Sequence, residues 1–186
     1  MFDFDETLYI DSRKAGAGEL LSLHLASLLN IYPEKPVFLC IGTEKVTGDT
    51  LGPLIGSLLL EKRKDMTVFG SLTMPVHALN LARTIADIRR DFPHNPVVAI
   101  DASLGVREHL GFLTLGRGSL APGAGVHKLL NSVGDLFLTG IVAPVGPFPQ
   151  FSLQNVSFST VFTLAELISD GILKALELRS AAVFSG

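Results

Sequence analysis

The chain has 186 residues, 47% of them apolar and 18% charged, a composition that excludes a disordered segment and fits one domain with a large core. Its formal net charge of −3 provides no broad cationic field, so we expect no nucleic acid partner. The single cysteine, Cys40, excludes a disulfide framework and fits a reducing cytoplasm.

The sequence also gives no sign of a membrane segment. No apolar stretch reaches the ~20 residues that a membrane-spanning helix requires, and the acidic N-terminus lacks the basic start of an export signal. We therefore expect a cytoplasmic protein with no membrane contact. A single domain is expected over residues 1–186, with residues 1–15 as a poorly ordered or peripheral N-terminus.

The first predicted elements are a helix followed by a strand-loop-helix unit. Leucines recur at helical spacing from about residue 18 to residue 30. The apolar run Val37–Ile41 predicts a strand that is buried on both faces. After a loop, residues 50–62 predict a second helix, because Gly52 and Pro53 suit a first helical turn.

The alternation of strand and helix continues, and it indicates an α/β fold with a mostly parallel, doubly wound sheet. The further elements are strands at 66–72, 96–100, 111–115 and 136–142, and helices at 75–90 and 161–178. The helix at 75–90 is expected to turn five residues inward, namely Ala78, Leu79, Ala82, Ile85 and Ile88.

Three polar residues follow predicted strands at the edge where open α/β sheets bind their ligands. They are Asp49, His77 and Asp101. If these loops converge, Asp49 and Asp101 come close enough to share a proton, which raises one carboxyl pKa and lowers the other. Such a pair can supply a base and an acid for the attack of water on an amide.

Each of these carboxylates also has a structural alternative. Asp49 is placed to cap the helix that follows it, and Asp101 could cap a turn or pair with Arg107. His109 and His127 could join the aspartates around a divalent metal, but their spacing is typical of no metal site. We therefore predict no metal and no cofactor.

The Gly/Pro-rich segment Pro122–Val126 allows two interpretations. Gly123 and Gly125 can form a backbone wall that holds an extended peptide, or a plain surface loop. His77 likewise either lines the crevice or has a structural role.

Six segments carry a family resemblance, and their order and spacing are consistent from about Pro36 to Leu178. They are Cys40–Thr43, Thr47–Leu54, Pro75–Leu81, Ala99–Ala102, Pro122–Val126 and Thr139–Val142. Together they resemble the YyaC family of sporulation proteins. That family is similar to the spore germination protease and, more remotely, to the hydrogenase maturation endopeptidases.

The resemblance implies a three-layer αβα sandwich of the phosphorylase/hydrolase-like kind. It also implies that Asp49 and Asp101 are catalytic, because the corresponding motifs of germination protease carry the two aspartates thought to cleave small acid-soluble spore proteins. Two features depart from that protease: Gly48 stands where it has proline, and this chain is much shorter and has no evident propeptide. Zymogen control and substrate choice are therefore not carried over.

The leading hypothesis is a sporulation-associated endopeptidase in the cytoplasm of the sporulating cell or forespore, with a peptide or small spore protein as substrate. Asp49 and Asp101 would activate water. The predicted substrate contacts are Gly42, Thr43, His77, Gly123 and Gly125.

Two other functions stay open at this point. One is a catalytically silent protein that binds a peptide or partner in the same crevice. The other is amide hydrolysis of a small molecule, in a crevice narrowed by residues 148–153. A homodimer is a further alternative, because Phe148 and Phe151 in a Pro-rich loop could leave apolar surface exposed.

Overall fold

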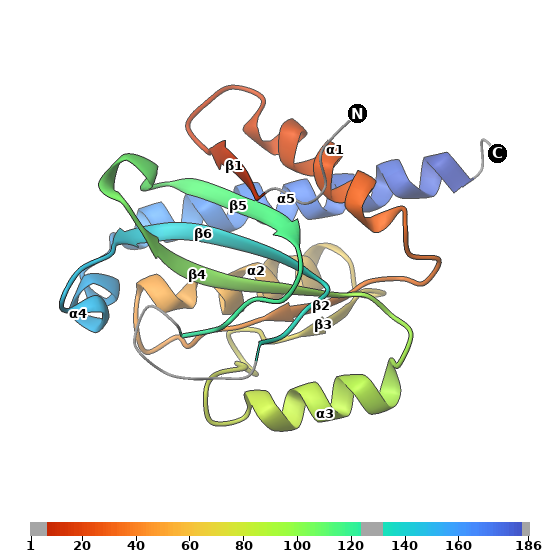
Figure 1. Cartoon of the computed structure of the whole chain (residues 1–186), viewed down its shortest axis with the longest axis horizontal. Coiled ribbons are helices and arrows are strands. Elements are labelled where there is room, and N and C mark those ends of the chain that lie inside the picture. The colour runs from red at the N-terminus through yellow and green to blue at the C-terminus, as the bar shows by residue number, and fades with distance from the viewer. Residues whose placement is uncertain (1–6, 124–131, 184–186) are drawn as a thin grey trace.

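A computed structural model describes residues 7–123 and 132–183, and a six-stranded sheet runs through its centre (Figure 1). The strands are β1 (Leu8–Asp11), β2 (Val37–Cys40), β3 (Thr67–Phe69), β4 (Val97–Gly105), β5 (Phe112–Arg117) and β6 (Leu136–Pro144). Their order across the sheet is β1-β5-β6-β4-β2-β3. The four strands from β6 to β3 are parallel, whereas β5 and β1 add an antiparallel edge.

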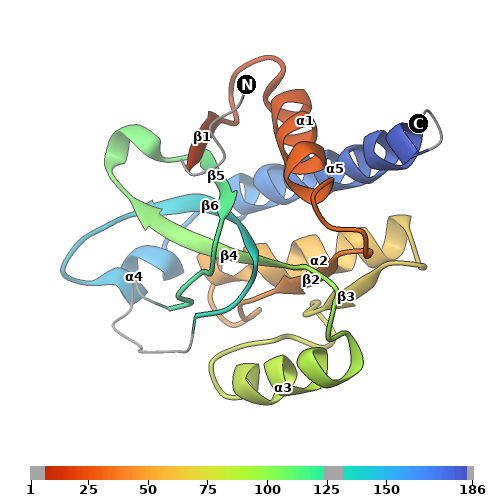
Figure 2. The same cartoon turned by 45° about the vertical axis from the view of Figure 1, so that its right-hand side comes forward.

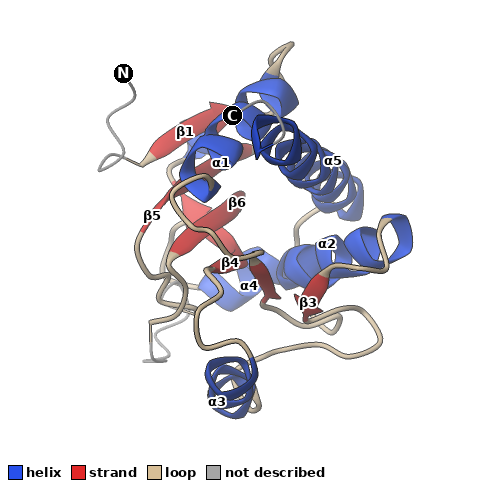
Figure 3. Ribbon diagram, turned by 90° about the vertical axis from the view of Figure 1, so that its right-hand side faces the viewer, coloured by secondary structure: helices blue, strands red, loops and turns tan. Residues whose placement is uncertain are grey.

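Helices cover both faces of this sheet. They are α1 (Ala17–Leu29), α2 (Leu51–Lys62), α3 (Leu81–Asp91), α4 (Pro149–Gln154) and α5 (Phe158–Val183), with short 3₁₀ turns η1 (Gly48–Thr50) and η2 (Arg107–His109). Helices α1, α2 and α5 pack on one face and α3 on the other, as the end-on view shows (Figure 3). The fold is therefore the predicted three-layer αβα sandwich. Within residues 7–123 and 132–183, no helix is long and apolar enough to span a membrane.

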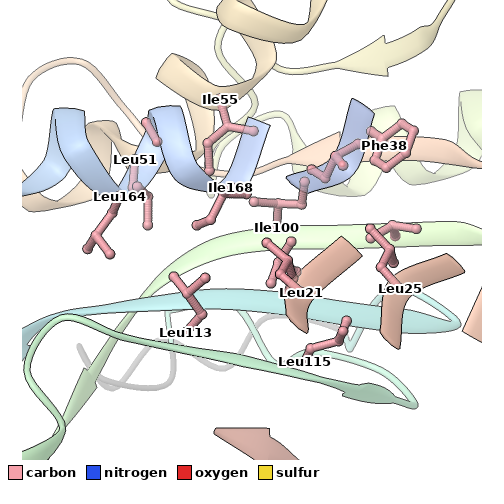
Figure 4. Close-up of a cluster of buried hydrophobic side chains, with 14 of the residues drawn as sticks. Leu21, Leu25, Phe38, Leu51, Ile55, Ile100, Leu113, Leu115, Leu164 and Ile168 are labelled. Carbon is pink, nitrogen blue, oxygen red and sulfur yellow. The ribbon is translucent and has the colours of Figure 1, made fainter. Parts of the chain in front are cut away.

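The alternation of side chains along β2 explains why its sequence is continuously apolar. Phe38 and Cys40 face the core formed with α1, α2 and α5 (Figure 4), and Val37 and Leu39 face the smaller core under α3. Successive strand residues point to opposite faces, so a strand covered on both sides needs apolar residues throughout. The prediction of a doubly buried strand is confirmed.

The sheet has a topological switch point between β2 and β4. From β2 the chain continues to β3 on one side, whereas β4 lies on the other side of β2. The connections therefore diverge at the carboxyl ends of these two strands, and such a divergence opens a crevice in α/β folds. The loop from Ile41 to Thr50 begins there.

Helix α3 begins six residues later than the sequence pattern predicted. The Asn80 side chain accepts a hydrogen bond from the His77 backbone N–H (2.8 Å) and donates one to the Pro75 carbonyl (2.9 Å), which holds the preceding segment as a loop. The expected inward positions Leu79, which is 93% exposed, and Ala82, which is also exposed, were therefore wrong. The expectation held for the two isoleucines of the helix, which are buried.

The sequence pattern also missed two short elements. β1 is an edge strand of four residues in which only Ile10 is buried, too short for a clear alternation. It falls within the first fifteen residues, for which no strand was expected. Helix α4 follows β6 and lies near its end, where a Pro-rich loop was predicted (Figure 2). Pro149 occupies its first turn, where the missing N–H costs nothing.

Candidate functional site

Asp101 lies inside β4, at the level where the neighbouring strand β2 ends. Cys40 and Ile100 are the last paired residues of the two strands, and β4 continues to Gly105 alongside β6. The sequence placed Asp101 just past a strand, whereas it is a member of the ladder opposite Thr139. It nevertheless lies at the switch-point edge, because β2 stops beside it.

The Asp101 carboxyl group is buried, with only 6% of the residue exposed. The backbone N–H of Ala102 donates to its Oδ1 at 2.8 Å, and the N–H of Gly123 also donates to the carboxyl group. Burial raises the pKa of Asp101 well above its usual range, and the charge of Asp49 raises it further, while the two N–H groups oppose this in part. Asp101 is therefore suited to carry a proton.

Asp49 lies in η1, at the end of the loop that follows β2, and η1 leads directly into α2. It is half-buried, and it is close enough to act on Asp101 electrostatically. A helix N-terminus carries partial positive charge, which favours the ionised form of a carboxylate beside it. The two aspartates thus have different surroundings, one buried within a strand and the other half-buried in a turn that leads into a helix.

A glycine brings the Asp49 segment close to the sheet. Gly42 has φ 145°, a backbone conformation that L side chains rarely adopt, and a Cβ there would overlap the carbonyl group of Asp49 and approach Pro53 Cδ to 2.9 Å. The residue before it, Ile41, donates its N–H to the carbonyl of Ile100 at 2.7 Å. The backbones that carry Asp49 and Asp101 are therefore linked through β2 and its loop.

Thr43 closes the same loop. Its N–H donates to the Asp49 carbonyl at 3.1 Å, and its own carbonyl accepts a hydrogen bond from the Thr50 hydroxyl at 3.4 Å. These contacts fix the loop that presents Asp49. A contact of Gly42 or Thr43 with a substrate stays a prediction.

His77 lies beside this loop, because the carbonyl of Val76 accepts a hydrogen bond from the Gly42 N–H at 2.8 Å. The His77 Nδ1 atom accepts a hydrogen bond from the Leu79 N–H at 3.3 Å. That bond requires the neutral ring to carry its proton on Nε2. The half-buried imidazole thus has a local structural contact, and a contact of His77 with a substrate stays a prediction.

The Gly/Pro-rich segment reaches the site through Gly123. This residue has φ 69°, in the left-handed region that favours glycine, and it supplies the second N–H to Asp101. Gly125 and His127 lie outside the described residues. His109 stacks between Tyr9 (5.1 Å) and Phe112 (4.9 Å), and within the described ranges no three His, Cys, Asp or Glu side chains gather as a metal site.

A row of hydroxyl groups extends the site across the sheet, and the sequence pattern did not single it out. The Thr139 hydroxyl lies 2.7 Å from that of Thr114 and 3.0 Å from that of Ser103. Thr139 is the register partner of Asp101 on β6, so the two side chains share a face. A threonine at an inward position of a buried strand is the signal that could have revealed it.

Removing the central hydroxyl of this row should destabilise the protein. Thr139→Val keeps the side-chain shape but leaves the hydroxyls of Ser103 and Thr114 without their shared partner, so we expect a loss of about 1–3 kcal/mol in the free energy of unfolding. Urea denaturation measures it. Thr67→Val on β3 is the control, because in the described part of the chain its hydroxyl makes no hydrogen bond. Equal stability of the two variants would contradict the network.

Exposed apolar side chains stand on two segments that contact the loop from Ile41 to Thr50. Helix α4 packs against η1, where a Cβ on Gly48 would approach Leu153 Cδ2 to 2.9 Å, and α4 presents Phe151 (67% exposed) next to Phe148 (73% exposed). The loop before α3 exposes Met74 and Leu79. We call these four exposed residues, Met74, Leu79, Phe148 and Phe151, the apolar rim. The close packing of Leu153 against Gly48 leaves no room for a side chain at position 48.

The fold and this edge define a three-layer α/β protein with an acidic pair at its topological switch point. The chain belongs to the family described as Protein of unknown function (DUF1256), whose model matches residues 9–171. It is similar to the Uncharacterized protein YyaC of Bacillus subtilis (strain 168), with 40% identity over 168 residues that cover 88% of this chain and 81% of that protein. The predicted resemblance to the YyaC family is confirmed, and the matched range contains both aspartates.

Proposed function

We propose that this chain is an endopeptidase that uses Asp49 and Asp101 to activate water. The observation that carries the proposal is the unequal environment of the two carboxyl groups at the switch point. Asp101 is buried, receives two backbone hydrogen bonds and has a raised pKa, whereas Asp49 stands at a helix N-terminus. Paired groups whose environments separate their pKa values are suited to act as acid and base.

The proposed reaction follows from these two roles, with Asp49 as the base and Asp101 as the acid. Asp49 accepts a proton from water as the water oxygen bonds to the peptide carbonyl carbon. Asp101 donates its proton to the amide nitrogen as the C–N bond breaks, which releases an acid and an amine. The proton held by Asp49 then passes to Asp101 and restores the starting state. Such proton transfers contribute about 10²–10⁴ each to the rate.

The apolar rim favours a polypeptide as substrate over a small molecule. Met74 and Leu79 are exposed on the loop before α3, and Phe148 and Phe151 are exposed at the start of α4, so we expect these two segments to hold apolar side chains of an extended polypeptide on either side of the scissile bond. A peptide or small spore protein fits this arrangement. The motif resemblance to spore germination protease supports the same assignment, and with it a role in the cytoplasm of the sporulating cell or forespore.

Cleavage of a small acid-soluble spore protein by the purified chain tests the proposal. Wild type should convert it to discrete fragments, and Asp49→Asn should reduce the rate at least about 100-fold, because the base is lost. Asp170→Asn is the matched control, since this exposed aspartate pairs with Lys62 on α2, away from the crevice. Mass spectrometry of the products measures the rates. Equal cleavage by wild type and Asp49→Asn would refute the assignment.

The apolar rim also favours a second candidate, a catalytically silent protein that binds a peptide or partner on the same edge. Binding of the spore protein with no cleavage, together with weaker binding by Phe148→Ser/Phe151→Ser, would support this function in place of hydrolysis. The exposure of Phe148 and Phe151 is also what a homodimer through this face requires. Sedimentation equilibrium of the same double variant distinguishes a dimer from a monomer.

A further inference from the structure

A pocket lies at the edge of the sheet opposite Asp49 and Asp101, near the amino ends of β2 and β3. Its volume is about 230 Å³. The segment before β2, the segment from the end of α2 to the start of β3, and the last turns of α5 enclose it. Since Asp49 and Asp101 belong to the carboxyl edge, this pocket is separate from the proposed catalytic site.

The floor of the pocket is apolar. Phe38 is only 1% exposed and belongs to the main core, and Met66 and Leu176 pack against that core as partly buried side chains. A ligand in the pocket would therefore rest directly on core side chains. The volume is below the roughly 300–1,000 Å³ of sites that enclose a drug-sized molecule, so a small apolar body fits with one end in solvent.

The rim of the pocket is cationic in a chain whose net charge is −3. It carries Lys35, Arg63 and Arg179, and Asp65 is the one carboxylate that lines it among the described residues. Asp65 is already paired, because Arg63 donates to both of its oxygens at 3.2 and 2.9 Å. Lys35 also acts on Asp65 electrostatically, as Glu34 does on Arg179, but neither cation forms an ion pair within the described residues, and the three lining cations outnumber the lining carboxylate.

Backbone hydrogen bonds fix the guanidinium of Arg179 at the rim of the pocket. Its Nη2 donates to the carbonyls of Tyr32 (2.6 Å), Pro33 (3.2 Å) and Glu34 (2.9 Å), which anchors α5 to the segment before β2. Within the described residues no carboxylate forms an ion pair with Arg179. Burial lowers the pKa of Arg179, and the more distant charge of Glu34 offsets this only in part. A preorganised, partly desolvated guanidinium binds anionic oxygens well.

We propose that this pocket binds a small amphiphilic anion, with its apolar body on Phe38, Met66 and Leu176 and its anionic group between Lys35 and Arg179. The shared chemistry is a carboxylate, sulfonate or phosphate on a short apolar body. The proposal is independent of peptide hydrolysis, so neither result decides the other.

Titration with the fluorescent anion 8-anilinonaphthalene-1-sulfonate tests the proposal. We expect saturable binding at one site, displaced by decanoate or decyl phosphate and much more weakly by decanol or inorganic phosphate. The two anionic competitors show which anionic group is preferred. Lys35→Glu should weaken binding about tenfold, because a charge-assisted contact becomes repulsive, while Lys35→Arg should retain it.

Lys14→Glu is the matched control, since it makes the same charge change at an exposed lysine near the other end of α1. It should bind as wild type does. Lys35 is exposed, so its variants should keep the fold, which circular dichroism verifies. The proposal is overturned by equal effects of the Lys35 and Lys14 variants, by equal displacement with decanol, by loss of binding in Phe148→Ser/Phe151→Ser, or by no saturable binding.

Discussion

The variant Asp101→Asn should lose cleavage and yet fold at least as stably as wild type at neutral pH. Asparagine has the shape of the aspartate and still accepts the N–H groups of Ala102 and Gly123, but it cannot transfer a proton. We expect cleavage of the spore protein to fall about 10²–10⁴-fold. The combination distinguishes a catalytic aspartate from a structural one, whose removal would cost stability.

The stability difference between wild type and Asp101→Asn should depend on pH, and its direction follows from the raised pKa of Asp101. Burial raises the folded-state pKa of Asp101, so between the ordinary aspartate pKa and the raised value the folded protein binds more protons than the unfolded chain. The contribution of Asp101 to stability is therefore fully present below the ordinary pKa and is lost as pH rises through the raised value. Asp101→Asn should lack this decline. Urea midpoints at intervals between pH 4 and pH 8 measure it.

Asp91→Asn is the control with the opposite sign. The hydrogen bond from the Arg90 side chain lowers the pKa of Asp91, so its contribution is present above the ordinary pKa and is lost as pH falls. If Asp101→Asn were less stable than wild type at pH 8, the ionised carboxylate would be stabilised in the fold. The assignment of Asp101 as the acid would then be wrong.

The variant Gly52→Ala should cost about 3 kcal/mol in the free energy of unfolding and displace the Asp49 loop. Gly52 lies in the first turn of α2 against the backbone of Ile41, and a Cβ there would overlap the Ile41 carbonyl and approach its nitrogen to 2.8 Å. Ile41 directly follows β2 and its backbone is hydrogen-bonded to Ile100 of β4, so it cannot shift without moving the sheet, and the helix must move away. Because η1 joins α2 directly, cleavage should fall as well.

Gly18→Ala is the matched control, a glycine near the start of another helix. A Cβ at Gly18 meets no atom within 4 Å, and its φ is not positive. Alanine should therefore keep or raise stability, by up to about 1 kcal/mol, because it restricts the unfolded chain. Urea denaturation compares the two variants. If both changed stability equally, the close approach of α2 to Ile41 would not limit the packing.

Elements whose signals are local could be predicted from the order of residues along the chain. The leucine spacing of α1, the continuous apolar run of β2 and the alternation of strands with helices predicted the α/β sandwich, because burial on one or both faces imposes these periods on the chain. The same patterns placed Asp49 and Asp101 at one edge of the sheet. Motif resemblance then identified the YyaC family.

Features that depend on contacts between distant segments could be read from the three-dimensional structure alone. Helix α3 begins later than its sequence pattern predicted, because Asn80 binds the backbone of Pro75 and His77. Thr139 lies beside Asp101, because the neighbouring strands β6 and β4 pair in that register. The fold also buries Asp101 under the N–H of Gly123 within reach of the Asp49 charge. A carboxyl pKa depends on desolvation and neighbouring charge in three dimensions, so no pattern along the chain could assign which aspartate is the acid.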